Sequence, residues 1–122
     1  GTPQGKVPVA VSDNWNTVIS AMEDVVNEPG GTAFGIGRGA TYRIAGKTGT
    51  AQVFGVKQNE RYKPQELEER FRDHALFIAF APVDDPEIAV AVIVENGGHG
   101  GSAAGPMARA VMDRYFFSKP VL

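Results

Sequence analysis

The sequence IAGKTGTAQVF at residues 44–54 decides how this chain folds. Its threonines, isoleucine and valine, and the absence of a helical period, predict a strand from about Thr41 to Phe54. Lysine and glycine are uncommon inside a strand unless something approaches its backbone from outside. We therefore expect this strand to form one wall of a reaction site, and the rest of the chain to hold it in place.

Composition limits the classes to which the protein can belong. The 122 residues are 43% hydrophobic and 21% charged, which predicts one small soluble domain. The net charge of −2 lacks the basic footprint of a nucleic-acid-binding protein. No long apolar run or basic leader occurs, so any anchor or export signal is expected outside this sequence. The absence of cysteine excludes disulfides, thiolate nucleophiles and most structural zinc sites.

Before the strand, the sequence predicts a tail and one helix. Residues 1–11 contain prolines and glycines without a helical period and are interpreted as a tail or linker. Ser12, Asp13 and Asn14 are typical helix caps, and the helix is expected from about Asn14 to Asn27. Its apolar residues recur at helical spacing and predict one buried face, comprising Trp15, Val18, Ile19, Met22, Val25 and Val26.

After the strand, the sequence predicts a polar insertion, a hairpin and a second helix. Residues 56–73 are rich in charge, with a short solvated helix expected over 64–72. The apolar runs 75–81 and 88–94 are joined by too few residues for a crossover and predict an antiparallel hairpin covered on both faces. A helix is expected to start at Ser102, with Pro106 near its first turn. Its buried face is predicted to comprise Ala104, Met107, Ala108, Val111 and Tyr115.

These elements predict an α+β fold. It consists of an N-terminal helix, a three-stranded antiparallel sheet with a helical insertion in its first hairpin, and a C-terminal helix. Two helices that flank the sheet in sequence can lie on the same side of it. We therefore expect part of the cover to be missing and the chain to be a piece of a larger domain.

The sequence Gly46-Lys47-Thr48 first suggests a phosphate-binding loop. That motif requires glycine five positions before Gly46, where Thr41 stands, and a helix after the lysine, where the sequence is extended. Lys47-Thr48-Gly49 also matches the last of the three elements S-x-x-K, S-x-N and K-[ST]-G of serine acyltransferases that process penicillin-like and D-alanyl compounds. Its extended context favours this second interpretation over an edge strand with a solvated lysine.

Strand geometry gives each residue of the motif a possible role. Lys47 and Gly49 are expected on one face, and Thr48 and Thr50 on the other. The ammonium of Lys47 and the hydroxyl of Thr48 suit a substrate carboxylate. Gly49 keeps the approach clear, and the backbone of Thr50 can pair with an added strand or serve as half of an oxyanion hole.

Four segments together resemble class B penicillin-binding proteins, in particular their elongation-specific members: residues 44–55, 69–77, 80–82 and 94–98. The similarity runs from about Ser12 to Phe117. It implies that residues 12–122 are the C-terminal portion of a transpeptidase domain whose sheet has five strands, these being the third to fifth. It also implies a peptidoglycan D,D-transpeptidase in which a serine attacks the penultimate D-alanine carbonyl, and which β-lactams acylate.

The resemblance further implies roles and partners. Lys47 and Thr48 would be catalytic, Gly49 and Thr50 substrate-binding, with no cofactor or metal. The partners would be the peptidoglycan stem peptide, β-lactams, the remainder of the same transpeptidase domain and the cell-wall elongation machinery. The location would be the periplasmic face of the bacterial inner membrane, with the anchor in a segment outside this chain.

The sequence departs from the family in one respect that matters for mechanism. None of its serines has lysine three positions later, so no S-x-x-K is present and this chain alone is expected to be inactive. Ser12-Asp13-Asn14 resembles S-x-N, but helix capping is the preferred interpretation. Two other functions stay open: a non-catalytic module that binds a peptide carboxylate, and a serine β-lactamase or D,D-carboxypeptidase of the same fold. His74 and His99 make a weak metal case, and the glycines at 97–101 predict a tight turn.

Overall fold

The computed structural model describes residue 1 and residues 4–53 and 68–118. Its elements are α1 (Ser12–Asn27), β1 (Ala45–Ala51), the 3-10 turn η2 (Glu69–Phe71), β2 (His74–Ala81), β3 (Ile88–Val94) and α2 (Gly100–Phe117). The α+β class and the predicted order of helices and strands are therefore confirmed. Within the described ranges, neither helix combines the length and the hydrophobicity that a membrane span requires.

The three strands form one antiparallel sheet in the order β1-β2-β3. The predicted hairpin of β2 and β3 is confirmed, and β1 lies at the edge with β2 as its neighbour. β1 is shorter than expected at both ends. Before it, Tyr42 turns away to bond Asp113 on α2, and after it the backbone N–H of Val53 donates to Asp73. At the two ends of β1, these side-chain hydrogen bonds take the place of the backbone pairing that the sequence composition predicts.

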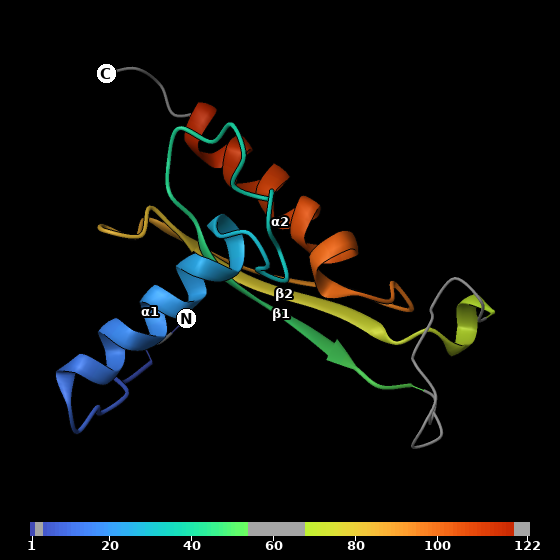
Figure 1. The fold of residues 1–122 in the computed structure, drawn as a ribbon, viewed down its shortest axis with the longest axis horizontal. Helices are drawn as coiled ribbons and strands as arrows, with labels where there is room; N and C mark the ends of the chain where they lie inside the picture. The colour runs from blue at the N-terminus through green and yellow to red at the C-terminus, as the bar shows by residue number, and fades with distance from the viewer. Residues whose placement is uncertain (2–3, 54–67, 119–122) are drawn as a thin grey trace.

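One face of the sheet is covered by α2, which runs alongside the strands for most of their length (Figure 1). The core between them contains Phe77, Ile44, Met112 and Val26 together with several alanines. The buried residues of α2 are Gly100, Ala104, Gly105, Ala108 and Met112. The predicted burial of Ala104 and Ala108 is confirmed.

The other three residues of the predicted α2 face are not buried, so this part of the prediction is wrong. Met107, Val111 and Tyr115 are 52%, 48% and 38% exposed. The small residues on the helix allow it to approach the sheet closely, so the larger apolar side chains are displaced to its flank.

The start of α2 also differs from the prediction. The helix begins at Gly100 rather than Ser102, so Pro106 lies at its seventh residue and not near the first turn. Proline lacks an N–H, so the carbonyl of Ser102 receives no helical bond from it. The run of glycines after β3 was interpreted only as a turn, and part of it is helical.

Only the C-terminal end of α1 joins the core, where Val26 is fully buried. The helix meets the sheet near the start of β1 and extends away from it (Figure 1). Trp15 and Val18 are consequently 53% and 47% exposed, and the prediction that they are buried is wrong.

The predicted cap of α1 is wrong as well. The helix starts at Ser12 with Val11 as its N-cap, and no side chain caps it. Ser12 to Asn14 form the first turn instead, where the carboxylate of Asp13 faces the positive end of the helix dipole.

The face of the sheet opposite α2 is largely open. Ile78 is 52% exposed and Ile93 66% exposed on this face. A groove of about 290 Å³ lies between it and α1, lined by Met22, Ile78, Ala79, Phe80, Ala89, Val90 and Ala91. The sequence predicted that both faces of the hairpin are covered. Among the described residues, α2 covers one face, and α1 covers only the β1 end of the other face. The expectation that part of the cover is missing agrees with this exposure.

The insertion after β1 falls mostly outside the described residues. Residues 54–67 are not described, and the end of the expected 64–72 helix is a single 3-10 turn at Glu69–Phe71 rather than an α-helix.

Candidate functional site

The predicted site residues lie together on β1, and their side chains alternate as expected. Lys47 pairs with the exposed Ile78 and Gly49 with Leu76, which places both on the open face. Thr48 pairs with the buried Phe77 on the α2 face. One backbone edge of β1 bonds β2, and among the described strands nothing pairs with its other edge. That edge is available for an added strand.

Lys47 is exposed, and its ammonium lies beside its own strand. The Nζ atom donates a hydrogen bond to the carbonyl oxygen of Thr48 at 2.7 Å. The positive charge is therefore held at the site rather than extended into solvent, where an anionic ligand approaching the strand meets it.

Thr48 has a specific partner that the sequence did not indicate. Its hydroxyl oxygen lies 2.9 Å from that of Thr32, in the loop that follows α1. No spacing or motif marks Thr32, since the two residues are sixteen positions apart and meet only in the folded chain. Thr32 is the site residue that sequence reasoning missed.

The glycine-rich start of α2 lies directly against the site strand. A Cβ atom on Gly100 would lie 2.2 Å from the carbonyl oxygen of Leu76 and 2.8 Å from that of Gly49. A Cβ on Gly101 would lie 2.1 Å from the carbonyl oxygen of Thr32. Both positions therefore require glycine because the backbones are so close. These contacts make the start of α2 a support behind the strand.

A second set of contacts attaches the loop after β3 to the start of β2. Asn96 donates its backbone N–H to Nδ1 of His74 at 2.9 Å and its side-chain amide to the carbonyl of Arg72 at 2.8 Å. Gly98 donates its N–H to the carbonyl of Asp73 at 2.8 Å. The carboxylate of Asp73, 6% exposed, accepts the N–H of Val53 just beyond β1. We name residues 72–74 with Asn96 and Gly98 the loop anchor.

The histidines are thereby assigned positions in the structure. His74 serves the loop anchor as a hydrogen-bond acceptor, so its Nδ1 carries no proton there. His99 is the N-cap residue of α2 and is exposed, which confirms its interpretation as a loop residue. Among the described residues, no group of three or more His, Asp or Glu side chains is arranged to hold a metal ion.

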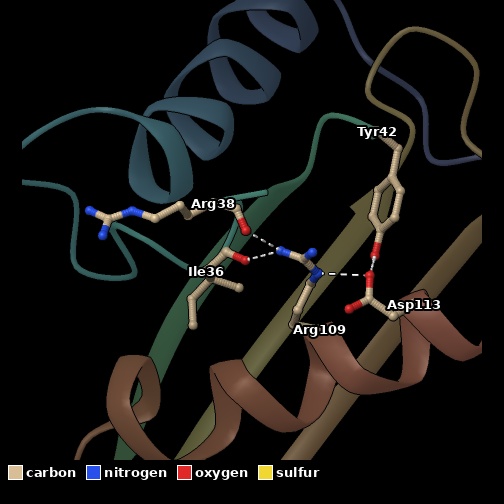
Figure 2. Close-up of polar contacts among 5 residues, drawn as sticks. All are labelled: Ile36, Arg38, Tyr42, Arg109 and Asp113. Carbon is tan, nitrogen blue, oxygen red and sulfur yellow. Dashed lines mark hydrogen bonds and ion pairs between the residues drawn. The ribbon is translucent and has the colours of Figure 1, made fainter. Parts of the chain in front are cut away.

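A polar network attaches the segment between α1 and β1 to α2 (Figure 2). Arg109 donates to the carbonyls of Ile36 and Arg38 at 2.7 and 3.1 Å and to Asp113 at 2.8 Å. The hydroxyl of Tyr42 donates to the same carboxylate at 2.6 Å. This network holds the segment that carries Thr32 and leads into β1.

The network shifts the pKa values of Tyr42 and Asp113. Burial and the bond to Asp113 raise the pKa of Tyr42 to about 12. Burial alone would raise the pKa of Asp113, but hydrogen bonds from Tyr42 and Arg109 outweigh it and hold the pKa below its usual range. At neutral pH the tyrosine is therefore a hydroxyl donor and the aspartate a charged acceptor.

Comparison with known proteins gives consistent matches. The family model for the penicillin binding protein transpeptidase domain matches residues 2–113. A peptidoglycan D,D-transpeptidase MrdA from Acinetobacter baumannii is 49% identical over 118 residues, covering 96% of this chain and 17% of that protein. The Escherichia coli K12 protein of the same name is 48% identical over 102 residues, covering 84% of this chain and 16% of that protein.

Solved structures match at the level of the fold as well. The Pseudomonas aeruginosa PBP2 in complex with WCK 5153 superposes with a TM-score of 0.75 at 39% identity, covering 95% of this chain and 22% of that one. A complex between PBP2 and MreC from Helicobacter pylori gives 0.68 at 31% identity, covering 87% of this chain and 18% of that one. The chain thus spans less than a quarter of the length of these relatives.

Proposed function

Since this chain belongs to the penicillin-binding protein transpeptidase family, we propose that it supplies the K-T-G strand of a peptidoglycan D,D-transpeptidase that works through a serine acyl-enzyme. Residues 12–122 are the C-terminal portion of that domain in this proposal, and residues 1–11 a linker. The similarity to D,D-transpeptidases of the MrdA type supports the reaction, and the similarity to solved PBP2 structures supports the fold.

One observation carries the proposal: the exposed Lys47 stands on an edge strand, on the side of the sheet that α2 does not cover. A substrate that pairs with the free edge of β1 passes directly beside the ammonium. Positive potential at that place suits the carboxylate of a D-alanyl peptide or of a β-lactam.

The nucleophile belongs to another segment in this proposal. A serine can attack only where its base lies within hydrogen-bond reach. The open face beside Lys47 has the apolar surface that a covering segment would bury, as exposed Ile78 and Ile93 indicate. A segment seated there would bring its own serine and lysine next to Lys47.

The roles of the strand residues follow from their positions. Lys47 attracts the carboxylate and favours the protonation states that proton transfer needs. Thr48 lies on the other face of the strand, but the twist of an edge strand lets neighbouring side chains reach one ligand along its free edge, so the Thr48 hydroxyl donates to the same carboxylate. Gly49 leaves room for the substrate backbone, and the N–H of Thr50 is one of two donors to the oxyanion.

Partners and location follow from the same relationship. The solved complex of a related PBP2 with MreC supports assembly with the cell-wall elongation machinery. Peptidoglycan stem peptides and β-lactams are the proposed ligands, and the periplasmic face of the inner membrane is the proposed site of action.

The test uses the full-length protein that contains this sequence. It should be labelled covalently by fluorescent penicillin, release D-alanine from a stem peptide ending in D-alanyl-D-alanine, and join the acyl group to an acceptor amine. The isolated 122-residue chain should not be labelled. A labelled band from the isolated chain would show that it contains a nucleophile and would contradict the proposal.

The other candidate functions give different outcomes in the same experiment. A β-lactamase would turn over the penicillin rapidly, and a carboxypeptidase would release D-alanine without forming the cross-link. A binding module would retain the peptide without any label.

A further inference from the structure

We propose that Thr32 is a positioning residue that orients the Thr48 hydroxyl toward the substrate carboxylate. The inference rests on the proposed function of Thr48 and adds a residue that lies outside the K-T-G motif. Its basis is the 2.9 Å separation of the two hydroxyl oxygens.

The backbone on both sides of Thr32 is fixed. A Cβ on Gly31 would lie 2.3 Å from the carbonyl oxygen of Val25, so this glycine packs tightly against the end of α1. Ala33 is 3% exposed and donates its N–H to the same carbonyl at 3.0 Å. The carbonyl of Thr32 itself meets Gly101 at the start of α2. The Thr32 side chain is therefore presented from a rigid support, although it is exposed to solvent.

The same surroundings determine the rotamer of Thr48. Its methyl carbon lies 3.5 Å from the position that a Cβ of Gly101 would occupy, while its hydroxyl is bonded to Thr32. A threonine side chain has three staggered orientations. The bond to Thr32 favours the orientation in which the Thr48 hydroxyl faces that residue.

The direction of the hydrogen bond follows from the number of donors. A hydroxyl has one hydrogen to donate and two lone pairs to accept. If Thr48 donates to the substrate carboxylate, its oxygen can only accept from Thr32. The bound state is thus a chain from the Thr32 O–H to the Thr48 oxygen and from the Thr48 O–H to the carboxylate, in which each bond polarises the next.

Acylation kinetics of the full-length protein test this inference. Two probes are compared: a penicillin with its free carboxylate and the methyl ester of the same compound. Thr32→Val keeps the shape of the side chain and removes its hydroxyl, and we expect it to slow acylation by the free acid about fivefold, with the ester changed little, as for loss of one hydrogen bond. Thr32→Ser should restore the preference for the free acid. Thr17→Val, an exposed threonine on α1, serves as the matched control.

A double-mutant cycle with Thr48→Val separates positioning from a general packing effect. Because Thr32 acts through Thr48, Thr32→Val should cause little further loss once the Thr48 hydroxyl is gone. An equal slowing of acid and ester, or a full additional loss in the double variant, would overturn the inference.

Failure of the inference is distinguishable from failure of the proposed function. A wild-type protein that is not acylated at all would reject both. Normal acylation with the same carboxylate preference in wild type and Thr32→Val would reject the positioning function alone.

Discussion

Lys47 and Ile78 are direct partners across the β1–β2 ladder, so the cation of the proposed site adjoins an isoleucine that is 52% exposed. A charged side chain and a large apolar one share the face that α2 does not cover. The apolar surface on this face is stabilised when it is buried, and the cation on the same face needs an anionic partner. A single covering segment beside the substrate would satisfy both.

The first prediction concerns Lys47. In the full-length protein, Lys47→Ala should slow acylation by fluorescent penicillin at least about 100-fold, because it removes a positive charge aimed at the substrate carboxylate. The melting temperature should change little, since the side chain is proposed to act through its charge rather than through packing. Lys6→Ala, another exposed lysine, provides the control. Unchanged acylation would remove Lys47 from the site.

The second prediction concerns the open face. If the remainder of the domain covers it, Ile78→Ala should lower the free energy of unfolding of the full-length protein by about 2–4 kcal/mol, as for truncation of a buried isoleucine. Val7→Ala, at a residue that is 74% exposed in the N-terminal segment, should change it by less than about 0.5 kcal/mol. Denaturant unfolding measures both. Equal, small effects would mean that Ile78 stays exposed in the full-length protein.

The third prediction concerns the loop anchor. Asn96 has a φ of 52°, in the left-handed region, and its side-chain amide bonds the carbonyl of Arg72. Asn96→Gly loses the amide bond but suits the backbone angle, whereas Asn96→Ala loses the bond and is strained. We expect losses in unfolding free energy of about 1 kcal/mol for glycine and about 2 kcal/mol for alanine.

Thermal or denaturant unfolding of the two variants gives the order directly. Asn14→Ala, in the exposed first turn of α1, is the control. If alanine is tolerated as well as glycine at position 96, the backbone angle has no energetic consequence there.

The fourth prediction concerns the Tyr42–Asp113 bond and alkaline pH. The folded protein raises the pKa of Tyr42 from its ordinary value of 10.0 to about 12. Folding therefore favours the protonated phenol, and the stabilisation is complete below pH 10.0 and is lost as the pH rises through about 12. Tyr42→Phe should be less stable than wild type at neutral pH, and the difference should shrink between these two pH values.

The measurement is the free energy of unfolding of the two proteins at a series of pH values up to 12. Tyr115→Phe is the matched control, since the rings of Tyr42 and Tyr115 both contact Phe116. A wild-type advantage that is constant across the range would contradict the pKa shift.

Much of the fold was readable from the sequence because it depends on local patterns. The continuous apolar runs and the short link between them specified the hairpin of β2 and β3, and proline and glycine marked the end of α1. The alternation of Lys47 and Thr48 between the two faces followed from strand geometry alone. The motif also identified the residues of the proposed site before any contact was known.

The sequence predictions were wrong where the burial or the partner of a residue depends on segments that are distant in the chain. Helical periodicity placed Met107, Val111 and Trp15 in the interior, but periodicity cannot tell how far a helix overlaps the sheet or how closely it approaches. The partnership of Thr32 with Thr48 joins residues sixteen positions apart, and no local pattern encodes it. The sequence by itself determined which side chains the K-T-G strand presents and to which faces. Only the tertiary structure decided which face stays open and which hydroxyl bonds that of Thr48, because both depend on the packing of segments that are distant in the chain.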